Sequence, residues 1–188
     1  MSPILGIMAS SMQGGIGDFQ SISTVTVGAG GQASISFTSI PSTYKHLQIR
    51  YIARSTSAQT FAGGLQIQYN GDTSSSYRSH RLVGRADGVV YSDSSSGTSV
   101  TVGLIAGGSG LANQFVPGVI DILDYASTNK TKVSRSLSGN EGQSTTTDND
   151  MHYISTLYNS TNAITQILLQ PSSNNIAQYS TFALYGIK

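Results

Sequence analysis

Alternation of apolar and polar residues with a period of two is the feature that most constrains this chain. In ASISFTSI, residues 33–40, Ile35 and Phe37 fall on one side of an extended strand, and hydroxyl side chains fall on the other. The same alternation returns at residues 46–52 and 65–69, and no stretch has a long helical period. We therefore predict an all-β fold, an antiparallel β-sandwich of jelly-roll-like form.

Glycine-rich and Asn-Gly segments predict where the strands reverse. Gly28–Gly31 lies between two alternating stretches and Asn70-Gly71 follows a third, so each is expected to close a hairpin. Segment 74–82, SSSYRSHRL, is predicted as a loop with room for one helical turn. Pro117 has no backbone N–H, which predicts an edge position or a bulge. Further strands are predicted at 88–93, 99–106, 115–125, 130–139, 151–159, 163–170 and 180–188.

Two segments rich in small polar residues, 92–99 and 139–150, are predicted as loops that project from the sandwich. If the protein recognises a ligand, these loops are where we expect the contact. The final stretch FALYGIK reads as a strand, so we expect the last residues to be built into a sheet. Leu184 and Ile187 are predicted to point into the core.

The chain is predicted to comprise an N-terminal arm, residues 1–18, and a single sandwich domain, residues 19–188. The arm combines apolar side chains with a glycine-rich hinge. Two interpretations stay open: it folds on its own core, or it docks on a neighbouring subunit, since a flexible apolar segment gains burial by pairing with another chain. The candidate partner-binding residues of the docking interpretation are Ile4, Leu5, Ile7 and Met8.

Composition excludes several classes of protein. Only 10% of the residues are charged and the net charge is +1, so the surface has no field that would concentrate a polyanion, and nucleic acid is not an expected partner. There is no cysteine, which excludes disulfides and thiolate metal sites. The N-terminal apolar run has no basic start and is too short to span a bilayer, so we expect no membrane association and synthesis in the cytosol.

Candidate catalytic or metal-binding residues are sparse. His46, His80 and His152 have no metal-type spacing, and Asp121 and Asp124, three apart on a strand, are expected to face opposite ways. A TDND stretch with two aspartates, residues 147–150, lacks the glycine and distant glutamate of a calcium loop. We expect no catalytic residues, no cofactor and no metal. The ten tyrosines suit cores and interfaces, with sugar stacking as the functional alternative.

Several stretches carry a family resemblance. They include MSPILGIMASSM at the start, SIPSTYKHLQIR at 39–50, NGDTSSSY at 70–77, ILDYASTNK at 122–130, AITQILL at 163–169 and FALYGI at 182–187. Together these motifs resemble a group of small virion proteins of tailed bacteriophages, and the likeness covers most of the chain. The segments 92–99 and 139–150 depart from it.

The resemblance implies a non-enzymatic virion component with a β-sandwich or jelly-roll-like fold, assembled in the host cytoplasm. Our first hypothesis is a head decoration or cement protein, a homotrimer that binds the major capsid protein and stabilises the shell. The alternative is a tail, baseplate or fibre component whose loops bind a host glycan.

Overall fold

The computed structural model describes residues 18–59, 61–141 and 149–188. The candidate partner-binding residues of the arm lie outside these ranges. The described residues form twelve strands, and they contain no helix that is long and apolar enough to cross a membrane. The strands are β1 (Phe19–Thr26), β2 (Ile35–Phe37), β3 (His46–Ala53), β4 (Phe61–Tyr69), β5 (Tyr77–Arg85), β6 (Val90–Gly97), β7 (Val100–Ala106), β8 (Val116–Leu123), β9 (Lys132–Asn140), β10 (Asp150–Tyr158), β11 (Ile167–Pro171) and β12 (Thr181–Ile187).

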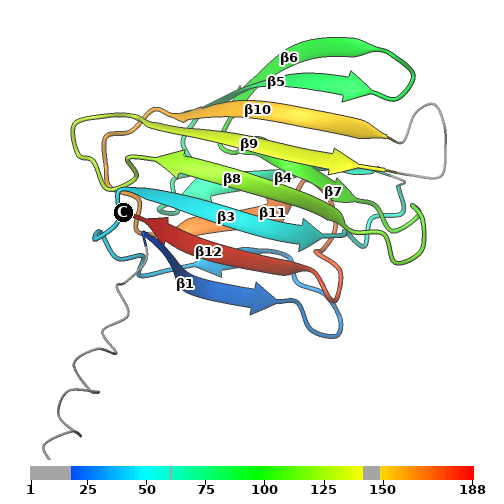
Figure 1. The fold of residues 1–188 in the computed structure, drawn as a ribbon, viewed down its shortest axis with the longest axis horizontal. Coiled ribbons are helices and arrows are strands. Elements are labelled where there is room, and N and C mark those ends of the chain that lie inside the picture. The colour runs from blue at the N-terminus through cyan, green and yellow to red at the C-terminus, as the bar shows by residue number, and fades with distance from the viewer. Residues whose placement is uncertain (1–17, 60, 142–148) are drawn as a thin grey trace, which may run out of the picture.

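The strands form two antiparallel sheets, which confirms the predicted β-sandwich. One sheet has eight strands in the order β1-β12-β3-β8-β9-β10-β5-β6, and the other has four in the order β2-β11-β4-β7. Figure 1 shows the larger sheet across the view, with β4, β7 and β11 behind its middle strands. We call the face of the larger sheet that packs on the smaller one the inner face, and the opposite face the outer face.

Alternating apolar side chains fill the space between the sheets as predicted. Leu47 and Ile49 on β3 and Leu65 and Ile67 on β4 are fully buried, and Tyr51 is 5% exposed. Each of these strands places every second side chain in the core, which is the physical meaning of the period-two pattern. Burying apolar area at about 25 cal/mol per Å² makes this layer the main source of stability.

The predicted hairpins at the two glycine turns are wrong, although the turns themselves are present. Gly30 and Gly31 have φ angles of 88° and 74°, and Asn70 and Gly71 have 55° and 67°. However, β1 and β2 lie in different sheets, as do β4 and β5, so each turn carries the chain from one sheet to the other. Residues with positive φ show where the chain reverses direction. Which strands then pair depends on burial of the apolar face of each strand, and the turn alone does not decide it.

The Asn70 turn is held by its own side chain. The Asn70 amide donates to the carbonyl of Ala163 at 2.8 Å, and its oxygen accepts from the backbone N–H groups of Thr165 at 2.9 Å and Gln166 at 3.1 Å. The Tyr158 hydroxyl donates to the Asp72 carboxylate at 2.9 Å. The NGDTSSSY motif, which follows β4 of the smaller sheet, is therefore hydrogen-bonded to β10 of the larger sheet.

Four further sequence predictions need correction, in whole or in part. Segment 74–82 is largely strand β5, without a helical turn, and residues 92–97 of the predicted loop 92–99 belong to strand β6. Residues 90–93 of β6 fall in the predicted strand 88–93, but the serine-rich remainder is exposed on both faces, so no apolar alternation extends that strand. Of segment 139–150, both ends are strand residues and 142–148 lie outside the described ranges. Pro117 lies in interior strand β8, before its ladder with β9 begins at Gly118, rather than at an edge or bulge.

The C-terminal strand β12 lies between β1 and β3, so the last residues are built into the sheet as predicted. Leu184 is fully buried on the inner face. Ile187 is on the outer face and only partly buried, so its predicted place in the core is wrong. The two residues are three positions apart, and an odd number of positions along a strand places side chains on opposite faces.

This difference gives a matched pair of substitutions. We expect Leu184→Asp to prevent folding, because it removes a buried side chain and places a charge in the core. Ile187→Asp should fold with a loss of about 1–2 kcal/mol, the range of ordinary surface strand substitutions. Circular dichroism and thermal unfolding of both variants test this; equal stability of the two would contradict the assignment of faces.

Candidate functional site on the outer face of the larger sheet

The outer face of the larger sheet exposes a group of large apolar side chains. Backbone register places Val119 opposite Leu137, Leu137 opposite Tyr153, and Tyr153 opposite Leu82, so the group crosses neighbouring strands from β8 to β5. Leu82 is 50% exposed, and Leu137 and Tyr153 are each 46% exposed. We call this group the apolar band; its exposed members are Ile52, Leu82, Val90, Leu137, Met151 and Tyr153.

A hollow of about 680 Å³ lies in the band where β3, β8, β9 and β10 run side by side. Val119 and Leu137 line it together with Gly139 and Met151. Gly139 contributes no side chain, which leaves the surface low at that point. Charged side chains at the hollow come from Arg50 and Glu141, and the rest of its lining is Gln48, Tyr51, Pro117, Gly118 and Ser138. The hollow suits an apolar side chain of a partner, with polar groups beside it.

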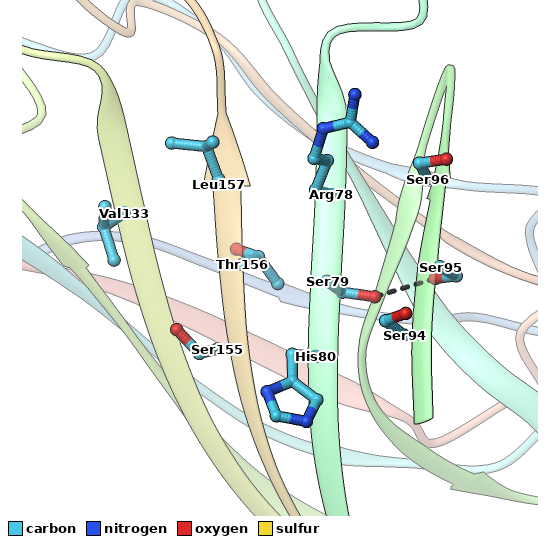
Figure 2. Close-up of a pocket in the computed structure, with 10 residues that line it drawn as sticks. All are labelled: Arg78, Ser79, His80, Ser94, Ser95, Ser96, Val133, Ser155, Thr156 and Leu157. Carbon is cyan, nitrogen blue, oxygen red and sulfur yellow. Dashed lines mark hydrogen bonds between the residues drawn. The ribbon is translucent and has the colours of Figure 1, made fainter. Parts of the chain in front are cut away.

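A second hollow, of about 510 Å³, lies across β9, β10, β5 and β6, and Figure 2 shows the residues around it. We call it the serine-lined hollow, because Ser79, Ser94, Ser95, Ser96 and Ser155 all contribute. The side chains of Arg78 and His80 reach it from β5 and make no hydrogen bond or ion pair with another described residue. Its remaining lining residues are Val133, Thr156 and Leu157.

The serine-lined hollow offers hydrogen-bond donors and acceptors to a polar ligand. Hydroxyl groups both donate and accept, and the Arg78 guanidinium only donates. Ser79 and Ser95 already share a hydrogen bond of 2.8 Å, drawn as a dashed line in Figure 2. Segment 92–99, where recognition was expected from the sequence, thus contributes Ser94, Ser95 and Ser96 to the hollow as part of a strand.

Beneath the apolar band, strand β9 turns polar side chains inward. All of its inward positions are buried: Lys132, Ser134, Ser136, Ser138 and Asn140. Its outward positions include Val133 and Leu137, so the alternation in KVSRSLSG points the apolar side chains away from the core. An apolar side chain on a strand normally faces the core, but on β9 the polar side chains do. Val133 and Leu137 are therefore left on the outer face, where Leu137 forms part of the apolar band.

Hydrogen bonds satisfy several of the inward polar groups of β9, although the buried Ser136 hydroxyl has no partner among the described residues. The Lys132 ammonium donates to the carbonyls of Ser127 and Lys130, each at 2.6 Å, and of Thr161 at 3.1 Å. Burial lowers the pKa of Lys132. Ser138 accepts from the backbone N–H of Leu104 at 3.0 Å. Buried polar groups are stable when paired in this way, and nothing in the local sequence announces the partners.

His152 is a second buried titratable residue that faces inward, in addition to Lys132 on β9. It is 2% exposed, neither ring nitrogen has a hydrogen-bond partner, and Nε2 lies 3.7 Å from the nearest Asp150 oxygen. Burial lowers the pKa of His152, and the nearby Arg81 guanidinium lowers it further, while Asp150 and Asp93 oppose both effects. His152 is therefore held neutral at physiological pH.

Of the other predicted candidates, only His46 and Asp124 are brought together, with Nδ1 of His46 3.8 Å from a carboxylate oxygen of Asp124. His80 is exposed on the outer face, and His46 accepts a hydrogen bond from the backbone N–H of Asp124 at 3.0 Å. Asp121 accepts from Gln48 at 2.7 Å, and Asp124 pairs with Lys130 at 2.7 Å, which lowers the pKa of Asp124.

The described ranges contain no group of three His, Cys, Asp or Glu residues that could hold a metal ion. In the TDND stretch, Asp148 lies outside those ranges, and Asp150 lies 3.6 Å from Arg85. Comparison of the chain with protein-family models, curated proteins and solved structures found no match.

Substitution of His152 should change how stability depends on pH. Because its folded pKa lies below the unfolded value of about 6.5, unfolding takes up a proton as the pH falls below about 6.5, and stability decreases toward acid pH. His152→Leu should therefore flatten the decline of the unfolding free energy between pH 7 and pH 5. Urea denaturation at several pH values measures it, with His80→Leu as the exposed control. An unchanged slope in His152→Leu would overturn the assignment.

Proposed function

We propose that this protein is a structural component of a tailed-bacteriophage virion, a head decoration or cement protein that stabilises the shell by surface contact. The sequence resemblance supports the virion setting, and the apolar band supports the mode of action. Soluble proteins that act as monomers rarely expose large continuous apolar patches, and such patches mark interaction sites. The band is the observation that carries the proposal.

The surroundings of the band support binding to the major capsid protein or to another copy of this chain. Many exposed positions of the larger sheet carry hydroxyl groups, and the net charge of the chain is +1. Such a surface associates through packing and short-range hydrogen bonds rather than through long-range attraction. On a symmetric shell, weak contacts of this kind are repeated many times, and their effect adds up.

The N-terminal arm supplies a second proposed contact. Its apolar residues Ile4, Leu5, Ile7 and Met8 lie outside the described residues, and the chain enters the fold at Asp18, whose carbonyl accepts the backbone N–H of Lys188 at 2.9 Å. The seventeen residues before Asp18 could span at most about 55–60 Å when extended. That length is enough to reach a neighbouring protein, so we propose docking of the arm on a virion partner.

The serine-lined hollow favours a second candidate, a tail, baseplate or fibre component that binds a glycan. Sugars present hydroxyl groups and an apolar C–H face, and this hollow presents hydroxyls beside Val133 and Leu157. The unpaired Arg78 would suit a carboxylate or phosphate on such a sugar.

Binding to separated virion parts tests the proposal. Purified protein is mixed with heads that lack it and, separately, with tails, and both are imaged. Ordered density on heads is the expected result; density only on tails would replace the decoration role with the second candidate. Leu137→Lys and Met151→Lys, each a charge in the apolar band, should abolish binding without unfolding. Thr24→Lys, an exposed substitution on the same face of β1, is the matched control and should still bind.

Removal of residues 1–14 tests the arm separately. Because the sandwich begins at Phe19, the truncated chain should fold with an unchanged melting temperature but bind heads at least about tenfold more weakly, a loss of about 1.4 kcal/mol. Sedimentation of heads with labelled protein measures this. Undiminished binding would show that the apolar band acts without the arm.

A further inference from the structure

Four of the described strands are sheet edges, and three of them carry features that prevent pairing with another chain. Strand β2 has only three residues, β1 has a register shift between Ser21 and Ser23, and the ladder of β7 with β4 has two shifts. Short edges and irregular ladders are ways in which proteins block edge-to-edge association. Strand β6 has neither: it has eight residues and a regular ladder with β5.

Strand β6 also lacks the charges that usually protect an edge. It contains no lysine or proline, and its single charged residue is Asp93. The Arg81 guanidinium binds both oxygens of Asp93, at 2.7 and 2.6 Å, and this pairing lowers the pKa of Asp93. The edge therefore presents a regular, neutral row of backbone groups.

The turn before β6 shows which backbone groups are free. The Arg85 N–H donates to the Val89 carbonyl at 3.0 Å, and hydrogen-bonded positions alternate along an antiparallel ladder. Residues 91, 93, 95 and 97 therefore bond to β5, while the N–H and C=O groups of Ser92, Ser94 and Ser96 point away from the sheet. Within the described part of the chain, no strand pairs with that side.

We propose that β6 pairs with β6 of a second copy, antiparallel and with Ser94 on the twofold axis. The free backbone groups of both strands belong to even-numbered residues. They lie opposite each other only when the twofold axis passes through a residue, because an axis between two residues would pair even-numbered positions with odd-numbered ones. Centring on Asp93 would place two like charges directly opposite, which is destabilising. Centring on Ser94 instead places Asp93 opposite Ser95 of the partner subunit.

The remaining pairs in this register are also complementary. Ser92 lies opposite Ser96 of the partner subunit, and hydroxyl pairs across strands stabilise a sheet. Tyr91, which is 37% exposed, lies opposite Gly97 of the partner subunit, and an aromatic ring covers the gap that a strand glycine leaves. The serine-lined hollow, to which Ser94 and Ser96 belong, then occurs once on each side of the axis.

This contact is independent of the virion role. It is isologous, so it produces dimers, and a trimer of the kind implied by the resemblance would need a different interface. The two larger sheets would join into one continuous sheet through backbone hydrogen bonds.

A single cysteine tests the register, because the natural chain has none. Residues that face each other in a hydrogen-bonded pair have Cα atoms about 5.5 Å apart, within the range of a disulfide. Ser94→Cys should therefore form a disulfide-linked dimer on mild oxidation. Ser92→Cys is the matched control: its own counterpart lies four residues along, about 13 Å away, so it should not cross-link. The double variant Ser92→Cys, Ser96→Cys should cross-link again.

A proline at position 94, on the proposed twofold axis, tests the contact without cross-linking. Ser94→Pro removes an N–H that points away from β5, so the monomer should stay folded, while each dimer loses two hydrogen bonds. Analytical ultracentrifugation should show a dissociation constant about ten- to a hundredfold higher, and Ser94→Thr should leave it unchanged. A wild-type chain that stays monomeric at its highest soluble concentration, a dimer unaffected by Ser94→Pro, or equal cross-linking of Ser92→Cys and Ser94→Cys would overturn the proposal.

Discussion

The structure depends on a mismatch in width, because an eight-stranded sheet is covered by a four-stranded one. Where the smaller sheet lies over β3, the inner face is apolar, with Leu47 and Ile49 fully buried. Near its edge strand β7 the inward side chains of β9 become polar. At β5 and β6, beyond that edge, the inner face carries the ion pair of Arg81 and Asp93. Polarity across the inner face thus follows how well each strand is covered.

The polar side chains of β9 also fix how the two sheets meet. Serines are short, and space above them is occupied by the Tyr51 phenol, which donates to the Leu104 carbonyl at 3.0 Å. An added Cβ at Gly103 or Gly118 would come within 2.0 and 2.3 Å of Tyr51 atoms, so these glycines are required by the close approach. A slip of β9 by one residue would move Leu137 inward and Ser138 outward, and would leave the Leu104 N–H unpaired. Leu137 is therefore exposed because the buried contacts of Ser138 fix which side chains of β9 face inward.

The sequence allows prediction of what depends on local pattern. The all-β class, the inward faces of β3 and β4 and the place of β12 in a sheet all follow from alternation. Partners across the sandwich could not be predicted, because the turn at Asn70 is compatible with a hairpin and with a crossover alike. The apolar character of the outer face could be predicted in part. Ile52 lies three positions after Ile49 in the same strand, so the two face opposite sides and the second face of this strand is not wholly polar. The inward positions of Lys132 and His152 had no signal in the alternation, since the carbonyls that accept from Lys132 lie in the loops around it and neither ring nitrogen of His152 has a hydrogen-bond partner.

The position of β12 has a consequence for synthesis of the chain. Among the described strands, β1 pairs only with β12, and β3 needs β12 on one of its sides, yet β12 follows all the other described strands in the chain. Until Thr181–Ile187 has been translated, both earlier strands present open edges. Contacts between such distant parts of a chain form slowly, and unpaired edges invite aggregation in the meantime. Pairing of β1 therefore has to wait for β12: a chain that is terminated before Thr181 leaves β1 unpaired and exposed to chaperones and proteases.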